Sequence, residues 1–519
     1  MKVLLDYRGL LIVAKEEIGA SRVHLISDLL VKEALHIWIS TDNLTKVVNF
    51  LKVHHGTNTA LDFADRFLRR CTTIPVRQAM IFDALKEEYG DLDANINIRI
   101  AQMFHIDCIL TPLPERYSHT KIPVTDLNDC CVLADDCQVN SVEKVPFLDL
   151  KAQHSRIYTE IDARITKIIA GTGFILGPQV NEFEQRFAEL QEVKFCLGVS
   201  SGTAALHISL MALNIGFNDH VLLPVNTFIA TAEAVSLAGA TPVFVDCDEY
   251  YQIDPEQLEK NIKNVIVEHK RPPKALIVVH LYGHPANMTR IMALAIEYGI
   301  EVIEDACQAH LARFDGKAVG QFGRFGAFSF YPGKNLGAYG EAGALITQDE
   351  KLYIKAKMLR QHGEIKRYQH ELVGHNYRMS AIQGAVLSTK LQYLPQWTIK
   401  RQAVAQRYNE ILSEIENLLL PAEYAGAESV YHLFVIQTDY RDELRQYLSK
   451  CGIDTGIHYP LALHQQTAYK YLGYKENDFP MARTAVEKIL SLPMYPELSE
   501  QQILYVCNKI KSFYKEWNQ

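Results

Sequence analysis

The sequence predicts an α/β protein whose main part is a largely parallel sheet covered by helices on both faces. Short apolar strands alternate with helices of apolar spacing across residues 145–394, which favours this architecture. A long helix after Pro395 opens smaller strand–helix units, so residues 395–519 are predicted to form a small α/β domain. Residues 1–126 predict a further small α/β domain, joined through a weakly periodic linker at 127–144.

The amino-terminal domain is predicted from five short segments. Apolar runs indicate strands at residues 3–5, 34–39 and 106–111. Helical apolar spacing covers residues 61–70 and 94–104. Strands and helices of this length are enough for a small α/β unit.

The strands of the main part are apolar throughout, as in strands that are buried on both faces. We expect strands at residues 195–199, 275–280, 301–303, 327–330 and 344–347. The expected helices cover residues 204–213, 288–298 and, at the start of the carboxy-terminal domain, 400–412. The strand–helix alternation therefore predicts a sheet with helices on both sides.

Composition and charge limit the possible partners. Hydrophobic residues make up 48% and charged residues 22%, which is typical of a globular protein. The net charge is -8, and residues 1–140 have 15 Lys and Arg against 19 Asp and Glu, which argues against a nucleic-acid partner. Apolar runs stay shorter than the roughly 20 residues that cross a bilayer. Because the ten cysteines lack zinc-ligand spacing and no secretory signal is recognisable, we expect a cytoplasmic protein with reduced thiols, without membrane contact or metal.

The first motif with chemical potential is SSGTAAL at residues 200–206, between a predicted strand and a predicted helix. Small residues at a helix start leave backbone N–H groups open at the positive end of the helix dipole, which suits a phosphate. A plain helix cap is the other interpretation of the same pattern.

The second motif is VIEDACQAH at residues 302–310. Its acidic pair, Glu304 and Asp305, lies at the carboxyl end of a predicted strand, where open α/β sheets bind ligands. A carboxylate there can keep a pyridine nitrogen protonated, which makes the ring an electron sink. An exposed strand end without a ligand fits these residues equally well.

The third motif is FSFYPGKNLG at residues 328–337, followed by GEAG at 340–343. Lys334 stands just past a predicted strand and among glycines, where loss of solvation favours the neutral amine that forms Schiff bases. Ser329 can add a hydroxyl to a phosphate site. A single lysine of this kind would otherwise be a solvated surface charge.

The three motifs in this order match the plan of type I aminotransferases. Residues 145–519 resemble the DegT/DnrJ/EryC1/StrS family of sugar aminotransferases over essentially their whole length. The matching stretches are PFLDLKAQ, SGTAALHISL, PVNTFIATAEAVSLAGATPVFVD, VIEDACQAH, FSFYPGKNLGAYGEAGA, GHNYRMSAIQGAVL and GIHYPLALHQQTAY. The resemblance implies the type I aminotransferase fold, with a mainly parallel seven-stranded sheet, and pyridoxal 5'-phosphate as the cofactor.

The resemblance also implies how the cofactor phosphate and ring are held. The backbone of Thr203 and Ala204 and the hydroxyl of Ser329 would bind the phosphate. Phe228 would lie against the ring, where an aromatic face fixes the ring plane. Asn376 resembles the residue that reaches a phosphate from the neighbouring subunit, which implies a homodimer with shared active sites.

Three residues would carry the chemistry by the same resemblance. Asp305 would pair with the pyridinium nitrogen, and Gln308 would hydrogen-bond the ring hydroxyl. Lys334 would form the Schiff base with the cofactor and then act as the general acid and base. The family's dehydratase members have histidine in place of this lysine, so the resemblance favours amino transfer over dehydration.

The implied reaction moves an amino group from glutamate to a nucleotide-linked keto sugar in two half-reactions. The run from GEIKRYQHEL through QWTIKRQ is more similar to members that aminate the 3-position of a 3-keto-6-deoxyhexose, with a 4-keto sugar as the alternative. The nucleotide is either dTDP or UDP.

Weaker candidates for contacts with the sugar nucleotide are Tyr377, Arg378, His458 and Tyr459, together with the glycine-rich stretch 171–177. Structural roles are equally consistent with these residues. Ala342 departs from the family's common GEGG, a change that bears on substrate fit and leaves Lys334 in place.

Residues 1–125 have a fainter resemblance to PIN-type nuclease domains, carried by VLLDYRG, GDLDANINIRIAQMFHIDCILT and KIPVT. Such nucleases gather carboxylates around divalent metal. Asp6 and Asp91 match, but Ala94 stands where an acid is expected and the segment after Thr111 lacks another. We therefore expect an inactive PIN-like domain used for assembly, regulation or protein contact. The alternatives for the chain are an RNA-binding or RNA-cleaving protein that acts through this domain, and a regulatory protein without turnover.

Overall fold

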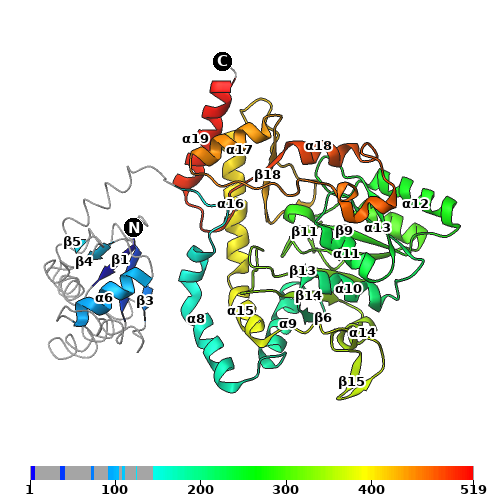
Figure 1. Ribbon diagram of the computed structural model, residues 1–519, viewed down its shortest axis with the longest axis horizontal. Coiled ribbons are helices and arrows are strands. Elements are labelled where there is room, and N and C mark those ends of the chain that lie inside the picture. Colours follow the sequence, from blue (N-terminus) through cyan, green and yellow to red (C-terminus); the bar gives the residue numbers. More distant parts are fainter. Residues whose placement is uncertain are drawn as a thin grey trace. The chain divides into compact units, whose positions relative to one another are not determined.

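The computed structural model describes residues 2–5, 36–40, 72–74, 92–103, 108–110, 124–125 and 144–517. The chain divides into two compact units, Met1–Ser141 and Val142–Gln519, and each is described by itself (Figure 1). The helix expected at 61–70, the linker up to residue 143, and the acids Asp6 and Asp91 lie outside the described residues.

The described part of the first unit contains a parallel sheet with the strand order β3-β2-β1-β4-β5. The helix α6 (Leu92–Met103) buries Ile98, Ile100 and Ala101, of which Ile98 and Ala101 share one face because they are three residues apart. The strands are β1 (Lys2–Leu5), β2 (His36–Ser40), β3 (Thr72–Ile74), β4 (Cys108–Leu110) and β5 (Val124–Thr125). The strands expected near residues 3–5, 34–39 and 106–111 and the helix at 94–104 are therefore present with shifted ends.

The second unit is built on a seven-stranded sheet within residues 144–517, with the order β6-β14-β13-β10-β9-β7-β8. Only β14 among these strands is antiparallel to its neighbours, so the sheet is mainly parallel, as predicted. The strands are β6 (Phe195–Val199), β7 (His220–Pro224), β8 (Thr241–Val245), β9 (Ala275–Val279), β10 (Glu301–Asp305), β13 (Phe325–Ser329) and β14 (Gly343–Thr347).

Helices cover both faces of this sheet because successive strand residues point to opposite sides. On β9, Ala275 and Ile277 belong to the core beneath α10 and α11, whereas Leu276 and Val278 belong to the core beneath α12 and α13. The helices of this part are α8 (Leu150–Gly171), α9 (Pro178–Leu190), α10 (Gly202–Ala212), α11 (Ile229–Leu237), α12 (Pro255–His269), α13 (Met288–Tyr298), α14 (Glu350–Arg360) and α15 (Ala381–Leu391).

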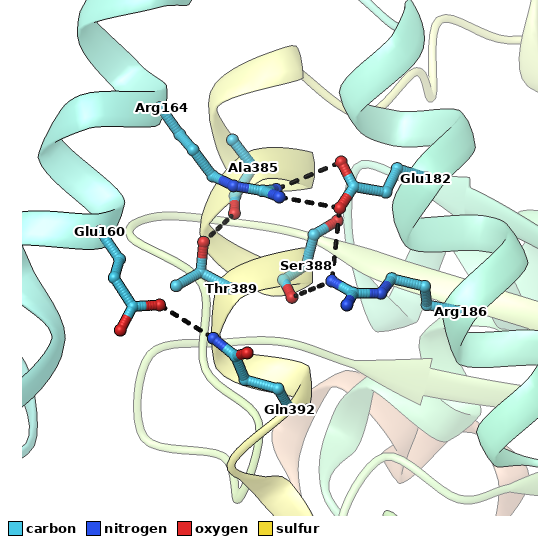
Figure 2. A network of polar contacts seen from close by, with 8 residues as sticks. All are labelled: Glu160, Arg164, Glu182, Arg186, Ala385, Ser388, Thr389 and Gln392. Atoms are coloured by element: carbon cyan, nitrogen blue, oxygen red, sulfur yellow. Dashed lines mark hydrogen bonds and ion pairs between the residues drawn. The ribbon is translucent and has the colours of Figure 1, made fainter.

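Polar contacts join α8, α9 and α15 into one layer, which Figure 2 shows. Arg164 on α8 donates two hydrogen bonds to Glu182 on α9, at 3.2 and 2.9 Å. Arg186 donates to the same carboxylate at 3.3 Å and to the backbone oxygen of Ser388 on α15 at 3.1 Å. We call these three helices the helix layer.

The carboxy-terminal part packs around its own core. Two antiparallel strands, β18 and β19, face helices whose buried residues include Tyr408, Leu444 and Ile510. Val145 joins this core and bridges Ile453, so the chain enters the second unit beside its carboxy-terminal part. The elements are α16 (Leu394–Leu412), β18 (Phe434–Gln437), α17 (Arg441–Lys450), α18 (Pro480–Lys488), β19 (Ile489–Leu492) and α19 (Glu500–Trp517).

Small elements complete the second unit. They are the strands β11 (Arg313–Phe314), β12 (Lys317–Ala318), β15 (Glu364–Lys366), β16 (Gln369–His370) and β17 (Ala427–Glu428), and the 3-10 turns η2 (Leu281–Gly283), η3 (Leu463–Gln465) and η4 (Thr467–Leu472). In the part of the chain that the structure describes, the helices are too short or too polar to cross a membrane, and side chains do not cluster as metal ligands.

Candidate active site

The candidate site lies where several strands end on one edge of the large sheet. β10 and β13 run in the same direction, and β6 shares it because β14 is antiparallel to both β13 and β6. The residues at or just after these ends are Ser200, Asp305 and Ser329. The first residue of β14, Gly343, pairs with both Ser329 and Val199. The three motifs of the sequence therefore meet at this edge.

The start of α10 is packed closely against this edge. Ser201 caps the helix through its side chain, which accepts from the Ala204 N–H at 3.1 Å. A Cβ atom on Gly202 would lie 2.8 Å from both the Cys307 Sγ and the Ser329 Cβ. A Cβ on Gly343 would lie 2.3 Å from the Ser201 carbonyl. Only glycine fits these two positions, and the close approach brings Ser329 beside the helix N-terminus that a phosphate favours.

The adjacent acids of the second motif have opposite surroundings because they point to opposite faces of β10. The fully buried Glu304 accepts from the N–H groups of Gly320, Phe322 and Gly323 at 2.6 to 2.7 Å, and lies 3.1 Å from His280 Nε2. This carboxylate holds the loop before β13 in place. Glu304 is thus a structural residue, and the pair of acids does not act as a unit.

Asp305 is 6% exposed and lies on the side of the strand that faces the helix start. Its Oδ2 accepts from the Thr231 hydroxyl at 2.9 Å, and its Oδ1 accepts from the Cys307 N–H at 3.2 Å. Each oxygen therefore has one fixed donor and keeps acceptor capacity for a ligand. A carboxylate held in this way can pair with a protonated ring nitrogen.

Lys334 follows β13 in a turn in which its N–H donates to the Tyr331 oxygen at 2.8 Å. Its side chain is half-buried. Loss of solvation lowers the pKa of the Lys334 ammonium, and the nearby Cys307 and Asp305 partly oppose this shift. A lowered pKa increases the fraction of neutral amine near pH 7, which is the form that attacks a carbonyl or accepts a proton.

Three histidines near Lys334 are held neutral. Burial, reinforced by the Lys334 charge, lowers the pKa of His310 to about 3 and that of His458 to about 4. The pKa of His432 also falls well below its usual value for the same two reasons. Near pH 7 these imidazoles therefore add no positive charge around the amine.

Gln308 joins the site to the carboxy-terminal part of the chain. Its Oε1 accepts from the Tyr282 N–H at 2.7 Å, and its Nε2 donates to the Tyr459 hydroxyl at 3.1 Å. The Tyr459 ring lies 5.5 Å from that of Phe228, which is 52% exposed at the start of α11. His458 is adjacent, and its backbone oxygen accepts from the Tyr282 hydroxyl. The structure thus brings Gln308, Phe228 and Tyr459 together.

The predicted residues 376–378 lie next to the end of β6. The Ser200 N–H donates to the Tyr377 oxygen at 2.9 Å, and Arg378 bridges Val199. The Tyr377 hydroxyl is 3.1 Å from His207 Nδ1, so it is already paired within the protein. Asn376 is exposed. In the described part of the chain, these three residues form no hydrogen bond or ion pair with Lys334 or Gln308.

Sequence reasoning missed three residues that shape the site: Thr231, His310 and Tyr282. Thr231 and His310 stand inside stretches that carried the resemblance, three residues after Phe228 and five after Asp305. A helical spacing of three from Phe228 was a usable signal for Thr231. Tyr282 had no local signal, because its contact with Gln308 joins segments 26 residues apart.

Comparison with known proteins gives a consistent result. The model of the DegT/DnrJ/EryC1/StrS aminotransferase family matches residues 155–511. A dTDP-3-amino-3,4,6-trideoxy-alpha-D-glucose transaminase of Streptomyces venezuelae is 39% identical over 72% of this chain and 96% of its own length. A UDP-N-acetyl-3-dehydro-alpha-D-glucosamine 3-aminotransferase of Acidithiobacillus ferrooxidans is 41% identical over 71% of this chain and 97% of its own.

A solved structure agrees in fold as well as in sequence. The S. venezuelae protein DesV, in complex with a ketimine intermediate, superposes with a TM-score of 0.69 at 40% identity, covering 72% of this chain and 99% of DesV. Residues 155–511, which the family model matches, include the seven-stranded sheet and most of the carboxy-terminal part. The family model and these relatives show that the chain belongs to the DegT/DnrJ/EryC1/StrS aminotransferase family.

Proposed function

We propose that the chain is a pyridoxal-phosphate-dependent aminotransferase that moves an amino group from glutamate to the 3-keto position of a nucleotide-linked 6-deoxyhexose. The observation that carries this proposal is the meeting of Lys334, Asp305 and the α10 N-terminus at one sheet edge. Two relatives whose names specify position 3 but different nucleotides, dTDP and UDP, support the 3-position over the 4-position.

The residues present fit this cofactor. The glycines at 202 and 343 let Ser329 pack against the start of α10, where the Thr203 and Ala204 N–H groups would bind a phosphate together with the Ser329 hydroxyl, the Ala204 N–H in exchange for its bond to Ser201. Asp305 would hold a proton on the ring nitrogen, and Gln308 would bind the ring hydroxyl. When bound, the cofactor supplies an electron sink for transfer of the amino group.

In the reaction, Lys334 would carry the proton. Its Nζ can accept and return a proton because its pKa is lowered toward the working pH. Phe228 and Tyr459 would limit the movement of the ring and exclude water from it. The candidate contacts with the substrate are Tyr377, Arg378 and His458. The Tyr377 hydroxyl is already bonded to His207, so Tyr377 would contact the substrate through its ring.

We further propose a homodimer in which the exposed Asn376 reaches the phosphate in the other subunit, and a cytoplasmic location. The free thiols of Cys196, Cys247 and Cys507 support a reducing compartment. For the amino-terminal unit, the parallel order β3-β2-β1-β4-β5 is compatible with a PIN-like domain, and the missing acid at Ala94 supports one without nuclease activity.

The test is an absorption spectrum of the purified protein with pyridoxal phosphate, before and after glutamate is added. We expect a band in the near ultraviolet to visible range that shifts with glutamate and returns when a dTDP- or UDP-linked 3-keto-6-deoxyhexose is added. The matched 4-keto sugar should restore the band more slowly. A protein that shows no band with excess cofactor would contradict the proposal. Faster recovery of the band with the 4-keto sugar would assign the amino transfer to position 4 of the sugar.

A further inference from the structure

A cavity of about 360 Å³ shares Tyr282 with the candidate active site and otherwise has its own lining. Its walls come from the turn after β8, the 3-10 turn η2 and the segment 419–435. Lys334, Asp305 and Gln308 are not among the described residues that line it. Its volume is in the range of small-molecule sites.

His284 is a wall residue of this cavity whose polar groups are unpaired. It is 7% exposed, and neither ring nitrogen has a hydrogen-bond partner. The ring stacks against Tyr250 at 6.0 Å and against Tyr424 at 5.1 Å, so its orientation is set by packing. Buried polar groups are normally hydrogen-bonded, so the unpaired ring nitrogens of His284 indicate a ligand that would form a hydrogen bond with them.

The protonation state of His284 defines what it can bind. Burial, assisted by the charge of His280, lowers the pKa of His284 to about 4. Near pH 7 the ring is therefore neutral, with one N–H donor and one nitrogen acceptor. An acceptor nitrogen suits a ligand that carries an N–H group.

The remaining lining favours a cation with an apolar body. Aromatic faces are the best protein surface for an organic cation, and carboxylates at the rim attract it. The tyrosines in the wall are Tyr250, Tyr251, Tyr282 and Tyr431. Glu249 and Glu423 are exposed wall residues, and Glu423 is hydrogen-bonded to Tyr431. Lysine and arginine are absent from the described lining, so no wall charge opposes a cation.

We propose that this cavity is a second ligand site, which binds a small protonated organic amine. The ammonium N–H donates to the neutral His284 ring, and the apolar body lies among the tyrosines. Glu249 and Glu423 attract the positive charge and repel anions such as a nucleotide diphosphate. The site is thereby separate in its chemistry from the site proposed for the sugar nucleotide.

The test is calorimetric titration of the cofactor-loaded full chain with N,N-dimethylbenzylamine. This tertiary amine is a cation near pH 7 and cannot condense with the cofactor aldehyde. Benzyltrimethylammonium is the matched cation without an N–H, and benzoate is the matched anion. The variants are Glu423→Gln and His284→Phe. Tyr282 is left unchanged because its N–H also binds Gln308.

We expect saturable binding of the tertiary amine, roughly fivefold tighter than that of benzyltrimethylammonium, and no binding of benzoate. Glu423→Gln, on an exposed side chain, should weaken binding of both cations roughly twofold to fivefold. His284→Phe should remove the difference between them. Absence of saturable binding, benzoate binding as tight as that of the amine, or unchanged amine affinity in both variants would overturn the proposal. Since calorimetry requires no turnover, this result is independent of whether amino transfer is observed.

Discussion

The helix layer and the candidate-site edge of the sheet both contain polar side chains, but the pairing of selected side chains in the two regions differs. In the helix layer, Glu182 receives bonds from two arginines, and Lys390, 2% exposed, donates to the Gly337 oxygen at 2.8 Å (Figure 2 shows part of this network). At the active-site edge, fully buried His310 keeps an unpaired Nδ1. Pairing makes Lys390 a structural residue, whereas the unused bonding capacity of His310 is available for a ligand.

The largest expected effect comes from replacing the half-buried Lys334 and the buried Lys390, one at a time. Lys334→Ala should abolish the cofactor band and lower amino transfer roughly 10³-fold or more, because a proton-transfer group is lost. Lys390→Met should keep the band and instead lower the unfolding free energy, since the Gly337 oxygen loses its donor. Spectra and urea unfolding of both variants measure this. If Lys390→Met also removes the band, the two regions are not separate in function.

The next test compares the adjacent carboxylates. Glu304→Gln places an amide NH₂ against backbone N–H donors and should lower the unfolding free energy by about 3 kcal/mol. Asp305→Asn should change stability little but lower kcat/KM roughly 10²-fold, because the ring nitrogen loses its anionic partner. Thermal or urea unfolding and steady-state rates distinguish the two. Equal loss of stability in both variants would show that Asp305 is also structural.

A third test uses pH. The folded pKa of His310 lies at about 3, below its unfolded value of about 6.5, so between these values the unfolded chain takes up a proton that the folded chain refuses. The contribution of His310 to stability is therefore fully present above pH 6.5 and is lost as the pH is lowered. At pH 5 this residue lowers the free energy of unfolding by about 2 kcal/mol. Urea unfolding at pH 7 and pH 5 measures the fall. His310→Phe should make the decline shallower by that amount, and an unchanged slope would contradict the assignment.

The smallest expected effect concerns Thr231. Thr231→Val removes the hydroxyl that donates to Asp305, which should lower kcat/KM roughly fivefold, equivalent to about 1 kcal/mol. Thr227→Val is the matched control, since the Thr227 hydroxyl contacts the Thr231 hydroxyl at 3.1 Å, whereas it is Thr231 that donates to Asp305. Steady-state rates compare the two. An equal fall in both would assign the effect to general packing.

The fold was predictable from sequence wherever apolar spacing and caps act locally. The helix expected at 288–298 forms with those ends, between the Asn287 cap and Gly299 in the left-handed conformation. The helix expected at 400–412 begins earlier, at Leu394, because Pro395 occupies a first-turn position that requires no N–H. The direction of β14 was not predictable, since it depends on partners on both sides of the sheet.

The site was predictable as far as strand ends determine it. That Lys334, Asp305 and Ser329 lie at one edge was predictable because each follows or ends a strand, and such ends meet at one edge. The separation of Glu304 from Asp305, and the contacts of Gln308 with Tyr282 and Tyr459, depend on segments distant in sequence. The cavity at His284 results from the packing of segments that are distant in sequence, so local sequence patterns do not predict it.

The close contact between Gly343 and the Ser201 backbone restricts which substitutions this protein can accept. A side chain at position 343 would overlap the Ser201 carbonyl, and one at position 202 would overlap Cys307 and Ser329. No single substitution at either glycine keeps the helix start in place, so random mutagenesis here should yield mainly inactive clones. A laboratory effort to broaden substrate range should therefore leave both glycines unchanged and direct its diversity to the exposed residues of β15 and β16.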